Sequence, residues 1–240
     1  MMKYSQIVCC LLATVMGTLF AQTSSRYSAT VHAESQLIPY RDGKAPTARG
    51  GLLGMEFSYQ QSPHLSYVGG LAYGRLSGLR KIRILEERFA SNGRLDVINH
   101  TIIVRGLTHL RYHLGIRFNR NADGVYGTVR LLVHQALRVV GIENQRRRDI
   151  RGVVSSYTTG TLRVNAGGAG WSGGSDRPAD YVAKQFSAAT NLEIGYRWTS
   201  GLAVYTGFSN DLTPRFRSDF VNSSRLIQYA IGVRCQLSKR

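Results

Sequence analysis

The sequence predicts an all-β fold, an eight-stranded antiparallel up-and-down transmembrane β-barrel, and three observations predict it. Apolar and polar residues alternate with a period of two in eight separate segments, as in strands with one apolar and one polar face. The connections between these segments are alternately long and short. Aromatic residues occupy the segment ends beside the short connections, where a membrane barrel carries its aromatic girdle.

The alternation favours strands over helices in each segment. In the fourth, Tyr112 and Leu114 alternate with Arg111 and His113, and a helix would scatter such cations around its whole surface. The predicted strands cover, in chain order, residues 27–37, 51–60, 65–76, 101–118, 125–139, 184–198, 202–210 and 225–237.

The connections carry independent information about the fold. The long ones cover residues 38–47, 77–100, 141–183 and 211–224, and the short ones cover 61–64, 119–124 and 199–201. Long loops on one rim and tight turns on the other are typical of outer-membrane barrels, in which an even strand number leaves both chain ends on the periplasmic side. The aromatic residues beside the short turns are Tyr59, Tyr67, Phe118 and Trp198.

The first residues predict export. Lys3 precedes an uncharged and mostly apolar run over residues 7–20, and a polar stretch follows Ala21. We therefore expect a signal peptide over residues 1–21 and a barrel domain over 22–240, located in the outer membrane of a Gram-negative bacterium. A retained anchor is the alternative, although the run is shorter than the ~20 apolar residues of a spanning helix.

The composition indicates an acidic partner. The chain has 31 Lys and Arg against 14 Asp and Glu, a net charge of +17. Nucleic acid, an anionic membrane surface and lipopolysaccharide phosphates all fit such a charge, but export argues against nucleic acid. The exported part keeps one cysteine, Cys235, so it forms no internal disulfide. No cofactor is predicted.

The polar faces of the strands predict the contents of the lumen. Eight strands enclose a space that side chains just fill, so buried charges there must pair or stay hydrated. We expect an ion-pair network that closes the lumen, with an anion-binding cavity as the alternative because arginine outnumbers glutamate. The residues predicted to point inward are Glu34, Glu56, Arg105, Arg111, Arg117, Arg130, Glu193, Arg197 and Arg234.

Two histidines and three outward cations are further candidates. His109 and His134 would face each other across the fourth and fifth strands, as a structural pair because no third metal ligand is evident. Arg75, Lys184 and Arg225 lie at strand ends beside the long loops and have outward parity. Cations there suit lipid phosphates, so we predict lipopolysaccharide contacts.

Two alternative functions are compatible with a barrel of alternating strands: an outer-membrane enzyme that modifies lipid A, and a soluble periplasmic binding barrel. A lipid-A acyl hydrolase needs a histidine just before its serine, and Ser209 follows Gly207 and Phe208 instead. A soluble periplasmic lipocalin-like barrel would place its apolar face inside, whereas here the charged face would be inside. We therefore predict a non-enzymatic barrel with a structural or loop-mediated binding role in the cell envelope.

The last predicted strand supports a family resemblance. Gly232, Cys235 and Leu237 occupy the positions of a glycine and alternating apolar residues that resemble the assembly signal of such barrels. Over residues 27–237 the chain resembles small outer-membrane barrels, the OmpA-like and PorT-like barrels of Bacteroidetes, but it lacks their usual final aromatic residue. The resemblance implies contact with the outer-membrane assembly machinery, and a PorT-like barrel would imply a part in secretion. The envelope protein partner is not identified by the sequence.

Overall fold

The structure is a computed structural model that describes residues 26–39, 48–91, 94–120, 123–148, 154–165, 183–216, 220–221 and 226–237. Side chains are not described at 80–91, 94–100, 102, 143, 145–148, 154–165 and 220–221. The predicted signal peptide over residues 1–21 and the predicted contact Arg225 lie outside the described residues.

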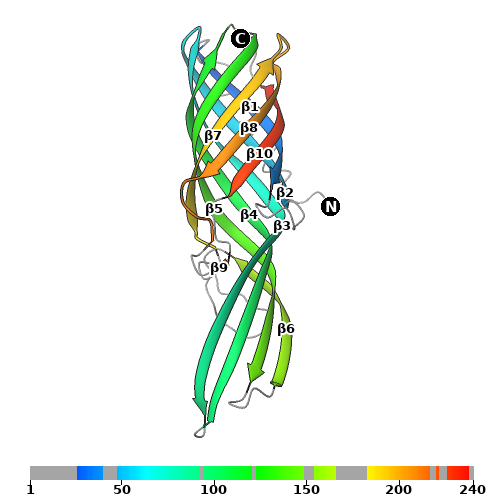
Figure 1. The fold of residues 1–240 in the computed structure, drawn as a ribbon. Helices are drawn as coiled ribbons and strands as arrows, with labels where there is room; N and C mark the ends of the chain where they lie inside the picture. The colour runs from blue at the N-terminus through cyan, green and yellow to red at the C-terminus, as the bar shows by residue number, and fades with distance from the viewer. Residues whose placement is uncertain are drawn as a thin grey trace.

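Eight strands close a barrel in which every neighbouring pair is antiparallel (Figure 1). The first strand pairs with the second on one side and with the last on the other, and these two pairings complete the closure. The predicted fold class is therefore confirmed. The barrel strands are β1 (Tyr27–Ile38), β2 (Ala48–Ser62), β3 (Leu65–Ser91), β4 (Arg94–Asn119), β5 (Gly124–Arg148), β7 (Phe186–Arg197), β8 (Leu202–Asp211) and β10 (Ile227–Gln236).

Three strands continue far beyond the barrel rim. The parts of β3, β4 and β5 outside the barrel pair with one another and with β6 (Val154–Asn165), and they form a sheet that projects from the rim (Figure 1). The short strand β9 (Phe220–Val221) pairs with β3 near the base of this sheet. The prediction that residues 77–100 and 141–183 are long loops is thus wrong for most of 77–100 and for residues 141–148 and 154–165. Ile82 and Ile84 alternate with charged neighbours there, and β-branched residues favour strands.

A β-bulge at Arg105 reverses the alternation in the part of β4 that leads into the projecting sheet. Val104 pairs with Gly141 and Gly106 with Val140, so Arg105 is the extra residue. Val104 is consequently fully buried, and Arg105 is exposed. The prediction that Arg105 points into the lumen is therefore wrong, because a one-residue slip moves side chains to the opposite face.

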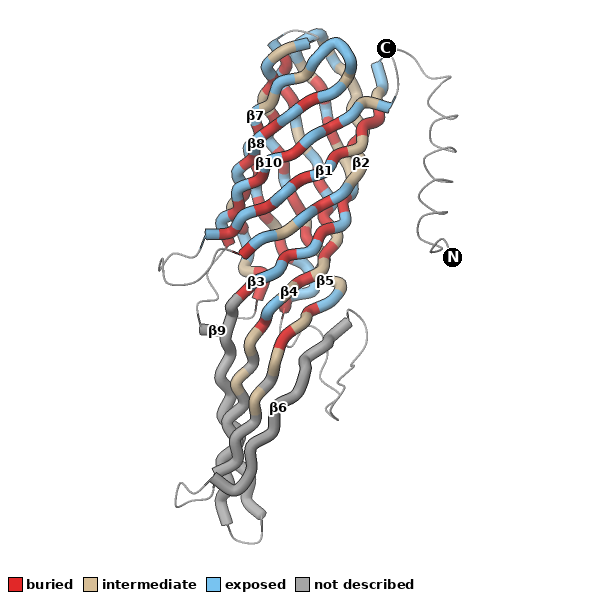
Figure 2. Tube along the Cα trace, turned by 90° about the vertical axis from the view of Figure 1, so that its right-hand side faces the viewer, coloured by how far each residue is buried: buried red, intermediate tan, exposed pale blue. Residues whose placement is uncertain are grey.

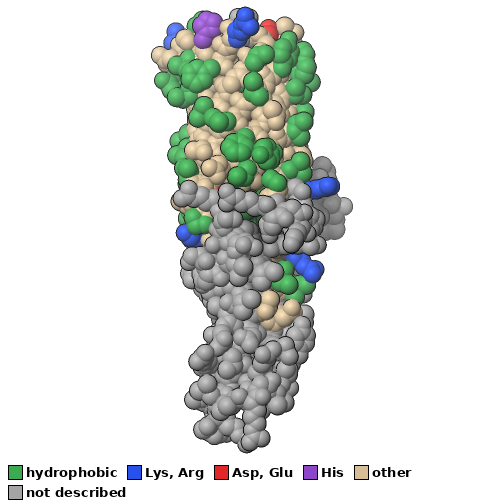
Figure 3. Space-filling model, viewed as in Figure 1, with side chains coloured by type: hydrophobic (Ala, Val, Ile, Leu, Met, Phe, Trp, Pro, Cys, Tyr) green, Lys and Arg blue, Asp and Glu red, His purple; other side chains and the backbone are tan. Residues whose placement is uncertain are grey.

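The outer face of the barrel carries an apolar belt. Figure 2 shows buried and exposed residues alternating along the barrel strands, and Figure 3 shows apolar side chains over the barrel wall. No outward-facing Lys, Arg, Asp or Glu interrupts this belt on the described strands. From Trp198 to Phe186, at ~3.3 Å per residue and a tilt of ~40°, the belt on β7 is about 30 Å high, which matches a bilayer core. No helix in the described part of the chain is long and apolar enough to cross a membrane.

Candidate functional site

The middle of the lumen is organised around Glu56 of β2. Its carboxylate is 1% exposed and accepts hydrogen bonds from Arg117 at 2.5 Å and from Arg130 at 2.8 Å. The guanidinium of Arg234 lies 3.6 Å from the same carboxylate, and Nε2 of His113 lies 3.4 Å from it. One carboxylate therefore joins strands β2, β4, β5 and β10 across the inside of the barrel.

Two further carboxylates extend this network. Glu193 of β7 accepts hydrogen bonds from Arg130 at 2.5 Å and from Arg234 at 2.9 Å and 3.1 Å. Glu34 of β1 forms a bidentate pair with Arg111 at 2.9 Å and 3.0 Å. A planar guanidinium matches a carboxylate in this way, and such charge-assisted bonds are among the stronger hydrogen bonds in proteins. The three carboxylates thus hold four arginines that would otherwise repel one another.

Aromatic side chains line the same space. The Arg234 guanidinium lies 4.6 Å from the ring centroid of Tyr205, and that of Arg117 lies 5.0 Å from the ring centroid of Tyr126. Tyr126 also accepts a hydrogen bond from Arg234 at 3.0 Å. A cavity beside these residues has a volume of about 10 Å³, which is close to the room that one water needs.

A second ion pair lies nearer the rim from which the sheet projects. Asp211 accepts two hydrogen bonds from Nε of Arg215, at 3.1 Å and 3.0 Å, and one from Nη2 at 3.0 Å. Arg215 also approaches Nε2 of His134 at 2.9 Å, and the backbone N–H of Leu226 donates to Asp211 at 3.2 Å. This pair ties the segment after β8 into the barrel.

An apolar cluster closes the lumen beyond that ion pair. Its members come from five barrel strands, where these reach the rim beside the projecting sheet, and from the segments around Ala183, Phe216 and Leu226, and all are nearly or fully buried. A bridge between Ala183 and Phe216 holds two of these segments together. This apolar cluster was not predicted from the sequence, because the apolar residues of the strands were assigned to the outer face. The cluster consists of Ile38, Ala48, Leu76, Leu79, Val104, Leu107, Val139, Ala183, Phe216 and Leu226.

The structure brings together most of the predicted lumen residues. Glu56, Arg117, Arg130, Glu193 and Arg234 are buried and joined by ion pairs. The buried pair of Glu34 and Arg111 is connected to them through Tyr205, which donates a hydrogen bond to Glu34 at 3.3 Å and whose ring faces Arg234. Arg197 is half-buried near the short turns and donates to Asn119 at 3.4 Å. Arg105 alone among the nine is exposed.

Four of the six histidines form two buried pairs. The rings of His109 and His134 lie 5.3 Å apart between centroids, although the strand partner of His134 is Arg111. The rings of His32 and His113 lie 6.0 Å apart. No group of three or more metal-ligating side chains occurs among the described residues.

Ser209, the serine considered for an acyl hydrolase, lies inside the barrel wall. Its hydroxyl accepts a hydrogen bond from Asn191 at 3.0 Å. No hydrogen bond joins it to a histidine within the described part of the chain. The arrangement that would activate this serine as a nucleophile is therefore not assembled there.

A basic collar borders the apolar belt on the side of the projecting sheet. Followed from the belt toward the projecting sheet, the first charged residue on the outer face is a cation at five places. These exposed cations are Arg49, Arg75, Arg105, Arg138 and Lys184. Figure 3 shows Lys and Arg side chains at both ends of the apolar zone. Two predicted lipopolysaccharide contacts, Arg75 and Lys184, belong to this collar, and cations at that level lie where lipid phosphates would be.

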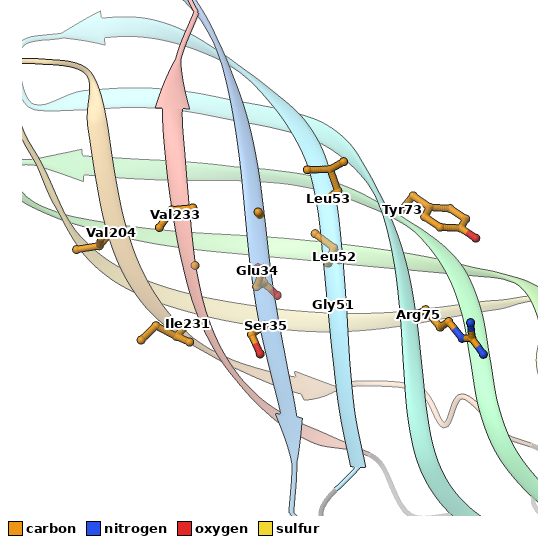
Figure 4. Close-up of a pocket in the computed structure, with 12 residues that line it drawn as sticks. Glu34, Ser35, Gly51, Leu52, Leu53, Tyr73, Arg75, Val204, Ile231 and Val233 are labelled. Carbon is orange, nitrogen blue, oxygen red and sulfur yellow. The ribbon is translucent and has the colours of Figure 1, made fainter. Parts of the chain in front are cut away.

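A groove crosses the belt beside the collar. It has a volume of about 660 Å³, within the range of ligand pockets, and it is lined by residues of β1, β2, β3, β8 and β10 (Figure 4). Its floor consists of the small residues Ala33, Ser35 and Gly51, and Arg75 stands at its edge.

No protein-family model and no curated protein matches this chain. Similar solved structures include the attachment invasion locus protein Ail of Yersinia pestis, at 9% identity and a TM-score of 0.40, covering 89% of this chain and 99% of that chain. The neisserial surface protein NspA has 9% identity and a TM-score of 0.35, covering 87% and 96%. The N-terminal β-barrel domain of Pseudomonas aeruginosa OprF has 11% identity and a TM-score of 0.33, covering 88% and 99%. At these values the barrel assignment rests on the strand pairing described above.

Proposed function

We propose that this protein is a non-enzymatic outer-membrane barrel with a closed lumen, which holds a β-sheet at the cell surface for binding in the envelope. The continuation of β3, β4 and β5 with β6 beyond the barrel carries this proposal. At ~3.3 Å per residue, the part of β3 from Ser77 to Ser91 is about 45 Å long. A sheet of that length reaches well past the lipid phosphates, where a partner has access to it.

The side chains that occupy the lumen support a role outside the barrel rather than transport through it. Ion pairs occupy the middle of the lumen, and the apolar cluster covers the end beneath the projecting sheet. The two ends of the barrel domain support an orientation with the projecting sheet outside the cell. Tyr27 and Leu237 both lie at the rim that carries the short turns. An exported chain places that rim in the periplasm and the sheet outside.

Cysteine labelling in intact cells tests the orientation. We expect Ser91→Cys, at the far end of β3, to react with an impermeant maleimide, and Ser62→Cys, beside a short turn, to react only after the outer membrane is permeabilised. The background carries alanine at Cys9, Cys10 and Cys235, and both variants must react fully in denaturant. Equal labelling of the two positions, or the reverse order, would contradict the proposed orientation.

A further inference from the structure

We infer that the groove across β1 binds one acyl chain of a phosphate-bearing outer-leaflet lipid with the chemistry of lipid A, and that Arg75 binds its phosphate. The inference rests on the membrane location proposed above and adds a specific lipid site to it. Three features of the groove carry it: a floor of small residues, apolar walls, and a cation at one edge (Figure 4).

Strand register defines the width of the groove. Ser35 pairs with Ile231 on one side and with Gly51 on the other, and Gly51 pairs with Arg75. Two strands with small outward residues therefore separate Ile231 of β10 from Arg75 of β3. At ~4.8 Å per strand spacing, this gap is about 14 Å wide, which leaves room for an extended hydrocarbon chain.

The walls of the groove are apolar side chains of the belt. Ile231 of β10 is 67% exposed and Leu53 of β2 is 66% exposed, so both stand out from the barrel surface on either side of Ala33 and Ser35 of β1. Tyr73 continues the wall on the side of β3. Such a groove lies within the charge-free belt, so the molecule that fills it in a membrane must offer a hydrocarbon surface.

The edge of the groove selects for phosphate. Arg75 follows Tyr73 by two residues on the same face, at the level where the belt ends, and it is exposed. No side chain that the structure describes forms an ion pair with it. Arg49 is its diagonal neighbour, since Arg49 pairs with Ser77 and Gly51 with Arg75. Two arginines at diagonal positions, which are about 7–8 Å apart along the backbone, lie next to an apolar groove and complement a lipid with phosphate on its headgroup.

The groove offers a substitution that fills it without disturbing the wall. A Cβ atom placed on Gly51 would have only the carbonyl oxygen of Glu34 near it, at 4.0 Å, so Gly51→Leu projects into open space. Gly127 on the outer face of β5 is a matched control, since its nearest atom, the carbonyl oxygen of Glu193, lies at 3.9 Å. Gly127→Leu makes the same chemical change away from the groove.

Binding of lipid A to the purified full-length mature chain in detergent, measured by native mass spectrometry, tests the site. We expect the wild type and Gly127→Leu to bind diphosphoryl lipid A equally. Arg75→Gln should weaken lipid binding on the order of tenfold, because the charged hydrogen bond to the phosphate is lost. Gly51→Leu should weaken it by a similar factor, because the leucine side chain occupies the groove in place of the acyl chain. Lipid A without its phosphates should bind the wild type with a similar loss, and excess inorganic phosphate should not displace the intact lipid.

Several results would overturn the inference. Unchanged binding by Gly51→Leu, equal loss in Gly127→Leu, or equal binding of phosphate-free lipid A would mean that lipid covers the belt without a specific site. Displacement by inorganic phosphate would indicate a plain anion site. Each variant must keep the heat-modifiable gel mobility of a folded barrel. Failure of the labelling test with intact lipid binding would reject the orientation and the outer-leaflet source of the lipid, whereas the phosphate-lipid site of the groove itself would stand.

Discussion

Replacement of Glu56 by Gln is expected to destabilise the barrel more than any other single change in the lumen. The substitution keeps the shape of the side chain but removes the charge that faces Arg117, Arg130 and Arg234. Loss of one partner from a buried ion pair costs about 3–5 kcal/mol where the site is dry. We therefore expect the folded gel band of Glu56→Gln to disappear at a clearly lower temperature than that of the wild type.

The control for this change is Asp123→Asn, which removes a carboxylate at an exposed position beside a short turn. It should leave the transition temperature within error of the wild type, because exposed charges contribute little. Glu193→Gln should lie between the two, since Glu193 holds Arg130 and Arg234 but does not contact Arg117 through a described bond. A Glu56→Gln barrel as heat-resistant as the control would show that the network does not stabilise the fold.

Replacement of Asp211 by Asn is expected to release the segment after β8 without unfolding the barrel. Asp211 is fully buried and binds both Arg215 and the backbone of Leu226. An uncharged amide leaves the Arg215 guanidinium without its carboxylate, again at a cost of about 3–5 kcal/mol if the residue stays inside. The segment avoids most of that cost by moving Arg215 into water.

Limited trypsin digestion measures this release. Arg215 is 3% exposed in the wild type, so cleavage after it should be slow. A loss of about 1.4 kcal/mol of local stability corresponds to a tenfold rise in the opened population, so Asp211→Asn should be cleaved there at least about tenfold faster. Mass spectrometry identifies the cleaved bond, and Asp123→Asn again serves as the control. Equal cleavage after Arg215 in all three proteins would mean that the Asp211 pair does not hold the segment.

Period-two alternation was sufficient to predict the barrel because it follows directly from burial on one face of each strand. The register of β1 with β2 and β10 places Glu34 inside and Ser35 outside, as the pattern indicates. Most of the inner network followed from the same parity. The bulge at Arg105 was not predicted: Gly106 beside it is a residue type that often marks a bulge, but glycines also occur at regular positions of these strands, and the pairing with β5 is what reveals it.

Long-range contacts explain the other differences. The apolar cluster that closes the lumen joins Phe216 and Leu226 to strands that are distant in the sequence. No local pattern in the sequence indicates that these two residues turn inward. The projecting sheet was readable in part, since Lys81 and Arg83 alternate with Ile82 and Ile84, although the register shift between Ser77 and Lys81 separates this alternation from that of the barrel strand. The groove over Ser35 and Gly51 depends on register, so it could not be predicted from either strand alone.

Conductance of the full mature chain in planar lipid bilayers tests the closed lumen, and with it the proposal that function lies in the projecting sheet. The ion pairs of Glu56, Glu193 and Glu34 occupy the middle of the lumen, and the apolar cluster around Phe216 occupies the end beside the projecting sheet, so we expect no continuous water path. Protein with the heat-modifiable mobility of the folded barrel should give the baseline current of a protein-free bilayer. A steady and reproducible conductance that rises with the amount of inserted protein would contradict the account.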